Sequence, residues 1–358
     1  MTELEQRRRS VQTALAALKA DALLVSSHAN LRYLTGYAGS NGLALVTPGE
    51  THFFTDPRYA LEASQSITCK VHIAKKALME AMAAIVKRKK LKKIRFEPAW
   101  LNLDQHQKLK NLLPSGVSLH PVPGVVENFR MIKSPEEIDQ IRRSVLVNSE
   151  AYARTLRRVR LGMRERDVAA ELDYQIRTLG AEKSAFDTIV AAGIRTALPH
   201  ASPTSRRLEE NDLLLIDMGA CLDGYMSDMT RVAFLGFPNK RIKTLYGAVL
   251  EAQLAAIDSV KPGVTATRVD AAAREVLKRH ALDRYFVHST GHGLGLEIHE
   301  GPRIGKKDQT KLTAGMAITI EPGVYIEGLG GIRIEDTVLV TANGCEVLTP
   351  TTKEFVHL

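Results

Sequence analysis

The chain has 358 residues, of which 44% are hydrophobic and 25% are charged, and its formal net charge is +9. Two domains are expected, because a single hydrophobic core seldom keeps growing beyond about 250–300 residues. The composition excludes a disordered or fibrous protein, and no run of about 20 apolar residues predicts a membrane span.

The start of the chain and its cysteines bear on where the protein works. Residues 1–10 are charged and lack the apolar stretch of an export signal. The three cysteines, Cys69, Cys221 and Cys345, are far apart and form no C-x-x-C pair. This pattern argues against a disulfide scaffold or a zinc knuckle. We therefore expect a cytoplasmic protein with no membrane partner.

The first part of the chain alternates helical and extended patterns. Residues 7–18 have the spacing of an amphipathic helix, and residues 22–26, 43–47 and 51–55 have the composition of buried strands. A Val-Pro-Gly sequence at 122–124 breaks the pattern. We expect an α/β domain of the usual size at this end of the chain.

A basic run lies inside this first domain. Six of the seven residues at 87–93 are lysine or arginine, which raises the question of a nucleic-acid partner. The run directly follows an apolar helical pattern at 78–86, so its cations complement the dipole at a helix C-terminus. No recognition motif or aromatic pattern accompanies it. We therefore expect no nucleic-acid binding.

The second domain opens with a strong helix start. Ser134, Pro135 and Glu137 supply a capping serine, a proline at the first helical position and a glutamate at the third. Apolar residues at helical spacing then continue to Leu156. The domains are accordingly predicted at 1–128 and 129–358.

The second domain contains an internal repeat. Two segments carry, in the same order, a glycine turn, a helix, a histidine and two carboxylates. In the first segment these are Gly162, 167–179, His200, Asp217 and Asp228. In the second they are Gly263, 269–280, His299, Glu321 and Glu335. Such a repeat predicts two similar halves that face one site.

The carboxylates predict a metal centre. Asp217 ends the apolar run 213–216, where a charge is costly to bury without compensation. Two unit charges about 4 Å apart repel by roughly 4 kcal/mol at an effective dielectric of about 20, so clustered carboxylates need cations. His292, between Gly291 and Gly293, adds a nitrogen donor. Mostly oxygen ligands favour two divalent ions, Mn²⁺ first, with Co²⁺ or Zn²⁺ as alternatives.

Several motifs resemble a known family. They are LIDMG at 215–219, GYMSDMTR at 224–231, HSTGHG at 288–293, IHE at 298–300, IEPG at 320–323 and GIRIED at 331–336. These motifs resemble the Xaa-Pro dipeptidase (prolidase) and aminopeptidase P branch of the pita-bread metallopeptidases. More loosely, YLTG at 33–36, GSNG at 39–42 and FTDPRY at 54–59 resemble its N-terminal domain.

The resemblance implies an α+β fold in which a pita-bread domain with a pseudo-twofold repeat follows a smaller creatinase-like α/β domain. It implies that the smaller domain mediates homodimerisation and closes the active site. Five residues would hold the metals: Asp217 one ion, Asp228 and Glu335 both ions, and His292 and Glu321 the other ion. Glu321, His200 and His299 would be catalytic, and His288 and His200 would contact substrate.

The implied activity is hydrolysis of the bond between an N-terminal residue and proline. A dipeptidase is preferred because Arg303, shortly after His299, can grip the free carboxylate of an Xaa-Pro dipeptide with two hydrogen bonds. The alternative for this residue is an ordinary surface arginine. Aminopeptidase P, which acts on longer Xaa-Pro peptides, remains an alternative. A non-catalytic binding protein on the same fold ranks lower, because all five ligands are present.

Overall fold

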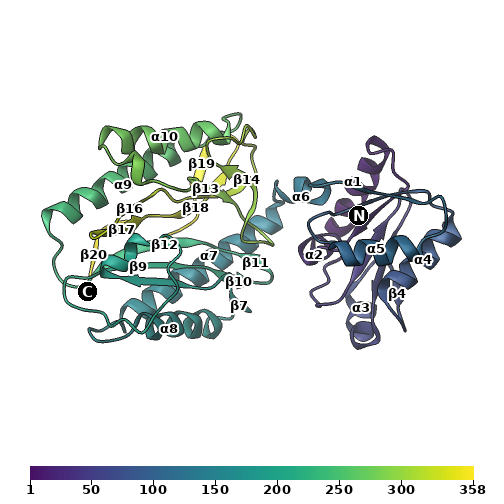
Figure 1. Ribbon diagram of the computed structural model, residues 1–358, viewed down its shortest axis with the longest axis horizontal. Helices are drawn as coiled ribbons and strands as arrows, with labels where there is room; N and C mark the ends of the chain where they lie inside the picture. Colours follow the sequence, from purple (N-terminus) through teal and green to yellow (C-terminus); the bar gives the residue numbers. More distant parts are fainter. The chain divides into compact units, whose positions relative to one another are not determined.

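A computed structural model describes all 358 residues and divides into two compact units, Met1–Arg130 and Met131–Leu358 (Figure 1). The α+β fold class predicted from the sequence is confirmed by the family models that match both parts of the chain. None of the helices combines the length and the apolar character that a membrane span requires.

The first unit is built on a six-stranded sheet with the strand order β4-β3-β2-β1-β5-β6. Its strands are β1 (Ala22–Val25), β2 (Leu43–Val46), β3 (Thr51–Thr55), β4 (Lys70–Ile73), β5 (Lys93–Phe96) and β6 (Ser118–Pro121). The pairs β1–β2 and β2–β3 are antiparallel, and the other pairs are parallel. The strands expected at 22–26, 43–47 and 51–55 are thus present as β1, β2 and β3, which lie next to one another in this sheet.

The helices of the first unit connect these strands. They are α1 (Glu3–Ala17), α2 (His28–Thr35), α3 (Ala60–Ser66), α4 (Leu78–Lys89), α5 (Leu103–Leu112) and α6 (Val125–Arg130), with a short 3₁₀ turn η1 (Pro57–Tyr59). Helix α4 ends in the basic run, and Lys90 caps it in the left-handed conformation at φ 55°. Lys89 pairs with Glu50. The run therefore lies at a helix C-terminus, where cations complement the dipole.

Four long helices enclose the second unit: α7 (Pro135–Leu156), α8 (Glu165–Thr178), α9 (Lys240–Asp258) and α10 (Ala266–Arg279). Helix α7 starts with a capping box in which Ser134 and Glu137 exchange hydrogen bonds of 3.1 and 3.2 Å. Figure 1 shows α7 and α8 on one side of the strands and α9 and α10 on the other.

Between these helices lie fourteen strands and two 3₁₀ turns. They are β7 (Lys183–Ser184), β8 (Ile189–Ala192), η2 (Gly193–Ala197), β9 (Leu213–Met218), β10 (Ala220–Leu222), β11 (Tyr225–Met226), β12 (Met229–Phe234), η3 (Asp283–Tyr285), β13 (Gly291–Gly293), β14 (Glu300–Ile304), β15 (Ala317–Ile320), β16 (Gly323–Ile326), β17 (Gly330–Arg333), β18 (Asp336–Val340), β19 (Cys345–Val347) and β20 (Val356–His357). The larger sheets have the orders β20-β12-β9-β8 and β14-β13-β15-β18-β19. Two smaller sheets are β11-β10-β7 and β16-β17.

The two halves of this unit follow the same plan. Helix α8 precedes the sheet that contains β9 and β12, and α10 precedes the sheet that contains β15 and β18. Strand β9 is buried on both faces: Leu214 and Ile216 pack in the core with α7 and α8, while Leu213 and Leu215 pack in the core with α9 and α10. Because side chains alternate along a strand, Asp217 shares the face of Leu213 and Leu215, toward the second half.

Candidate metal centre

The first pair of carboxylates is brought together by the β9–β12 ladder. In this antiparallel pair Asp217 lies opposite Thr230, and Met218 lies opposite Met229. Asp228 directly precedes β12, so it lies beside the end of β9 that carries Asp217. Both carboxylates therefore reach the same edge of the first sheet.

The second pair repeats this arrangement on β15 and β18. Ile320 lies opposite Asp336, so Glu321, which follows β15, and Glu335, which precedes β18, flank the same end of the ladder. The hairpin of β16 and β17 connects them. Thr319 donates a hydrogen bond of 3.2 Å to Oε1 of Glu321, which fixes that carboxylate.

His292 lies on β13 between two glycines that the packing requires. A Cβ at Gly291 would lie 1.9 Å from the Thr319 carbonyl oxygen, and a Cβ at Gly293 would lie 2.1 Å from the Gly301 carbonyl oxygen. The backbone amide of His292 donates to Thr319 Oγ1 at 3.1 Å, and its Nδ1 lies 3.0 Å from the Gly293 carbonyl oxygen. Its Nε2 is thereby left to face the carboxylates.

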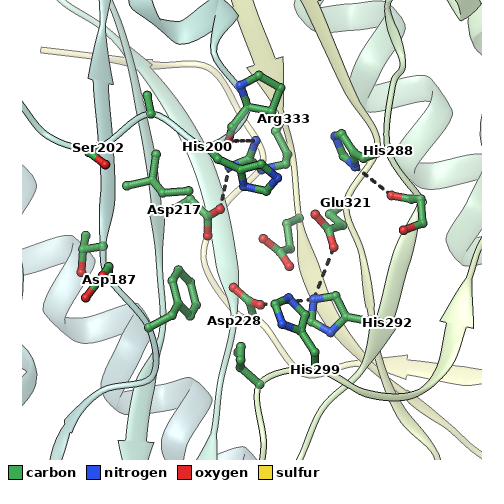
Figure 2. Close-up of a pocket in the computed structure, with 18 of the residues that line it drawn as sticks. Asp187, His200, Ser202, Asp217, Asp228, His288, His292, His299, Glu321 and Arg333 are labelled. Atoms are coloured by element: carbon green, nitrogen blue, oxygen red, sulfur yellow. Dashed lines mark hydrogen bonds and ion pairs between the residues drawn. The ribbon is translucent and has the colours of Figure 1, made fainter. Parts of the chain in front are cut away.

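Distances within the cluster are typical of groups that share an ion. His292 Nε2 lies 3.6 Å from Asp228 Oδ2 and 3.5 Å from Glu321 Oε1, which is longer than a normal hydrogen bond. One ligand atom from each of Asp228, His292 and Glu335 lies within 4.8 Å of the others. Figure 2 shows Asp228 from the first half of the unit and His292 and Glu321 from the second half converging on one place.

The chemistry of the cluster fits divalent cations. Three of its buried carboxylate oxygens, Asp217 Oδ1, Asp228 Oδ1 and Glu335 Oε1, have no hydrogen-bond partner. Burial and the neighbouring carboxylates raise the pKa of Asp228 and of Glu335 well above the ordinary range. Burial also raises the pKa of Glu321. Such a cluster is costly unless positive charge compensates it.

A cavity of about 730 Å³ opens on the cluster. All nine residues singled out in the sequence line it: His200, Asp217, Asp228, His288, His292, His299, Arg303, Glu321 and Glu335. Burial lowers the pKa of His299, and the neighbouring His292 and His200 lower it further, which favours the neutral form of the ring. The ring of His299 lies 4.4 Å from that of His292 in an edge-on arrangement.

Arg303 projects to the same face of the β13–β14 strand pair as His292. In the β13–β14 ladder it is directly opposite His292, and residues opposite each other project to one face of a sheet. Its side chain is exposed, and Nε donates to Ser289 Oγ at 3.1 Å. The guanidinium therefore borders the cavity while its remaining donors stay accessible.

Arg333 is the residue of the site that sequence reasoning did not single out. It lies in the GIRIED motif, two residues before Glu335, and this spacing places both on one face of an extended segment. Its guanidinium donates to Asp217, Thr230 and Tyr325 at 2.6, 3.0 and 2.6 Å. The alternating pattern is the signal that could have identified it.

Comparison with known proteins places these features in a family. The model of metallopeptidase family M24 matches residues 139–342, and the creatinase/prolidase N-terminal domain matches residues 7–132. An Xaa-Pro dipeptidase of Pyrococcus furiosus is 38% identical over 338 residues, which cover 94% of this chain and 95% of the relative.

Solved structures agree with the family models over nearly the whole chain. An Xaa-Pro dipeptidase from Bacillus anthracis superposes with a TM-score of 0.97 at 35% identity, covering 99% of this chain and all of that one. An X-Pro aminopeptidase from Thermotoga maritima superposes with a TM-score of 0.90 at 34% identity, covering 97% of this chain and all of that one.

Proposed function

The chain belongs to metallopeptidase family M24 and carries a creatinase/prolidase N-terminal domain, and we propose that it hydrolyses Xaa-Pro dipeptides. The observation that carries this proposal is the convergence of four carboxylates and one histidine on a single cavity. An Xaa-Pro dipeptidase that matches 94% of this chain supports the same activity.

We assign the metal ligands as Asp217, Asp228, His292, Glu321 and Glu335. The ligand set is rich in carboxylate oxygen, which favours manganese over a thiolate-type zinc site. When bound, a pair of divalent ions supplies Lewis acidity to the scissile carbonyl and makes a water molecule nucleophilic at neutral pH. The three unpartnered carboxylate oxygens of the cluster support this assignment.

The remaining steps of the hydrolysis are carried out by side chains of the protein. His299, which lies beside His292 and whose neutral form is favoured by burial, donates a hydrogen bond to the oxygen on which negative charge develops. Glu321 takes up the proton that the attacking water releases and hands it to the proline nitrogen as the C–N bond breaks. That nitrogen belongs to a tertiary amide without an N–H, so the cavity needs no acceptor there. His200 and His288 contact the substrate from the cavity wall.

Arg303 supports a dipeptidase rather than an aminopeptidase P. The carboxylate of a dipeptide lies directly beyond the proline ring, and a guanidinium at the cavity edge can bind it with two parallel hydrogen bonds. A longer peptide places a neutral amide at that position. Aminopeptidase P activity is the second candidate, because an X-Pro aminopeptidase structure superposes with a TM-score of 0.90.

Substrate length is the decisive test. Rates of Leu-Pro and Leu-Pro-Gly cleavage are compared under added manganese, with release of proline and of leucine as the readouts. We expect kcat/KM for Leu-Pro to exceed that for Leu-Pro-Gly by at least about tenfold, which corresponds to one charge-assisted hydrogen bond. A preference for Leu-Pro-Gly would establish the aminopeptidase P alternative.

The assembly and the compartment are also proposals. We propose a homodimer, because the N-terminal unit carries none of the residues of the metal centre and is implied by the family resemblance to mediate dimerisation. We propose that the protein works in the cytoplasm. Its three cysteines, Cys69, Cys221 and Cys345, form no disulfide bond, as expected in a reducing compartment.

A further inference from the structure

The loop between β13 and β14 carries His299. The side chain of Glu300 accepts a hydrogen bond from the backbone of this loop. Oε1 of Glu300 accepts a hydrogen bond from the backbone amide of Glu297 at 3.1 Å. Gly295 permits this arrangement, because a Cβ there would lie 2.8 Å from the same oxygen. The amide of Gly295 in turn donates to the Glu297 carbonyl oxygen at 3.0 Å. Glu300 therefore shapes the backbone that leads to His299.

Lys133 supplies the positive charge that compensates the buried carboxylate of Glu300. Its Nζ lies 3.1 Å from Oε2 of Glu300, and the two side chains are only 1% and 6% exposed. The backbone amide of Lys133 donates to the Gly315 carbonyl oxygen at 2.9 Å, and Nζ also donates to the Met131 carbonyl oxygen at 3.4 Å. The segment between α6 and α7 is thereby fixed beneath the loop. Because both charges are removed from water, the loss of one leaves the other uncompensated.

The two neighbouring histidines of the site depend differently on this loop. His292 lies within β13 and is fixed through the hydrogen bond of its amide to Thr319. His299 lies at the end of the loop, next to Glu300, with its ring against that of His292 (Figure 2). A change in the loop therefore displaces His299 relative to the metal ligands. A displacement of about 1 Å in a catalytic group can cost on the order of 100-fold in rate.

We propose that Lys133 and Glu300 are a pair of positioning residues for His299. Lys133 neutralises the buried carboxylate, and Glu300 holds the loop in the conformation that directs His299 to the cavity. Lys133 does not line the cavity, and Glu300, which does, acts in this proposal through the loop and not by contact with the substrate. The kinetic consequence rests on the proposed hydrolase function, whereas the conformational consequence can be measured without any turnover.

Hydrogen exchange of the metal-free protein tests the conformational part. In Lys133→Met, the amide of Glu297 loses a stably placed acceptor, and we expect its exchange to accelerate by at least about tenfold. The matched control is Arg142→Gln, which removes an exposed ion pair to Glu346 and should leave this amide unchanged. Unchanged exchange at Glu297 in Lys133→Met would overturn the proposal, even if the enzyme proves inactive on Xaa-Pro dipeptides.

Steady-state kinetics of the manganese-loaded enzyme test the catalytic part. We expect kcat of Lys133→Met to fall by about 10- to 100-fold while KM changes by less than about threefold. The double variant Lys133→Met/Glu300→Gln removes both charges and keeps an acceptor for the Glu297 amide. It should recover kcat and exchange protection to within about threefold of wild type, because replacing both members of a buried pair costs far less than removing one.

A double-mutant cycle separates positioning of His299 from a general loss of structure. In a His299→Ala background, Lys133→Met should lower kcat no further, because the group that it positions is already absent. An equal loss of kcat in both backgrounds would refute the assignment. If Lys133→Met does not fold, Glu300→Gln takes its place in the cycle, since it also breaks the charge pair while keeping the acceptor.

Discussion

Nη2 of Arg333 donates a hydrogen bond of 2.6 Å to Oδ2 of Asp217, and the other oxygen of that carboxylate, Oδ1, has no hydrogen-bond partner. The guanidinium thus fixes the rotation of Asp217 and leaves one oxygen available for a cation. Arg333 also donates to Thr230, and Thr230 donates to Glu335 at 2.6 Å. One buried arginine therefore orients two of the proposed metal ligands, one directly and one through Thr230, from both halves of the unit.

Arg333→Lys should weaken metal binding. Lysine cannot donate in parallel to Asp217, Thr230 and Tyr325, so two of the three groups lose their orientation. Loss of such an orienting partner typically lowers metal affinity by about 10- to 100-fold. Isothermal titration of the metal-free protein with manganese measures this change. Arg206→Lys is the matched control, because Arg206 makes a comparable two-bond pair with Asp212 outside the cavity. Equal affinities for Arg333→Lys and wild type would contradict the prediction.

Asp228→Asn should abolish activity, raise the stability of the metal-free protein and reduce the stabilisation by metal. In the metal-free protein, removal of one of four clustered negative charges relieves repulsion, so we expect Tm to rise. In the presence of manganese the variant should gain less stability than wild type, because its ions bind more weakly. Thermal unfolding with EDTA and with manganese provides both readings. Full activity, or an unchanged shift of Tm by manganese, would remove Asp228 from the ligand set.

His288 should make the metal-free protein sensitive to acid. Burial, followed by the neighbouring Arg333, lowers its pKa from 6.5 to about 4. The folded state thus binds fewer protons than the unfolded state between these values, and stability is lost as the pH falls from 6.5 toward 4. The loss attributable to this group is at most about 3 kcal/mol.

The measurement is the free energy of unfolding by urea at pH 6.5 and pH 4.5 in EDTA. His288→Gln removes the titrating ring and keeps a group that can pair with the Tyr325 hydroxyl, which lies 2.9 Å from Nε2 of His288. We expect the variant to lose less stability than wild type over this interval. His120→Gln, at an exposed position, is the control. Equal losses in His288→Gln and wild type would show that another group causes the sensitivity.

Arg303→Ala should raise KM for Xaa-Pro dipeptides by at least about tenfold, since a lost charge-assisted pair typically costs about 1.5–3 kcal/mol. Cleavage of a longer Xaa-Pro peptide should change little, because its proline carries no free carboxylate. Lys306→Ala, three residues away, controls for the loss of a positive charge near the cavity. An unchanged dipeptide KM would leave the dipeptidase preference without its structural basis.

The protein should be a dimer in solution. Light scattering at working concentrations is expected to give twice the chain mass of 39.4 kDa. Deletion of residues 1–130 would then test whether the first unit is required for dimerisation. A monomer of the full chain at these concentrations would contradict the prediction.

The features that could be predicted from the sequence are those determined by residues close together in the chain. The capping box at Ser134 and Glu137 predicted the start of α7, and the apolar run before Asp217 predicted β9 with a carboxylate that needs compensation. The order of ligands along the chain, together with the motifs around them, was sufficient to identify the family. Each of these signals depends on a few consecutive side chains and on backbone geometry with a fixed period.

Tertiary structure alone decided which side chains meet. Arg333 and Asp217 are separated by 116 residues, and Lys133 and Glu300 by 167, so no local pattern joins them. The loop that admits the Glu300 carboxylate exists because β13 and β14 pair with an irregular register after His292. Sequence patterns determine which residues are charged and which strands form. Strand register and the exclusion of water determine which charges must be paired, because a buried charge is tolerated only beside its partner.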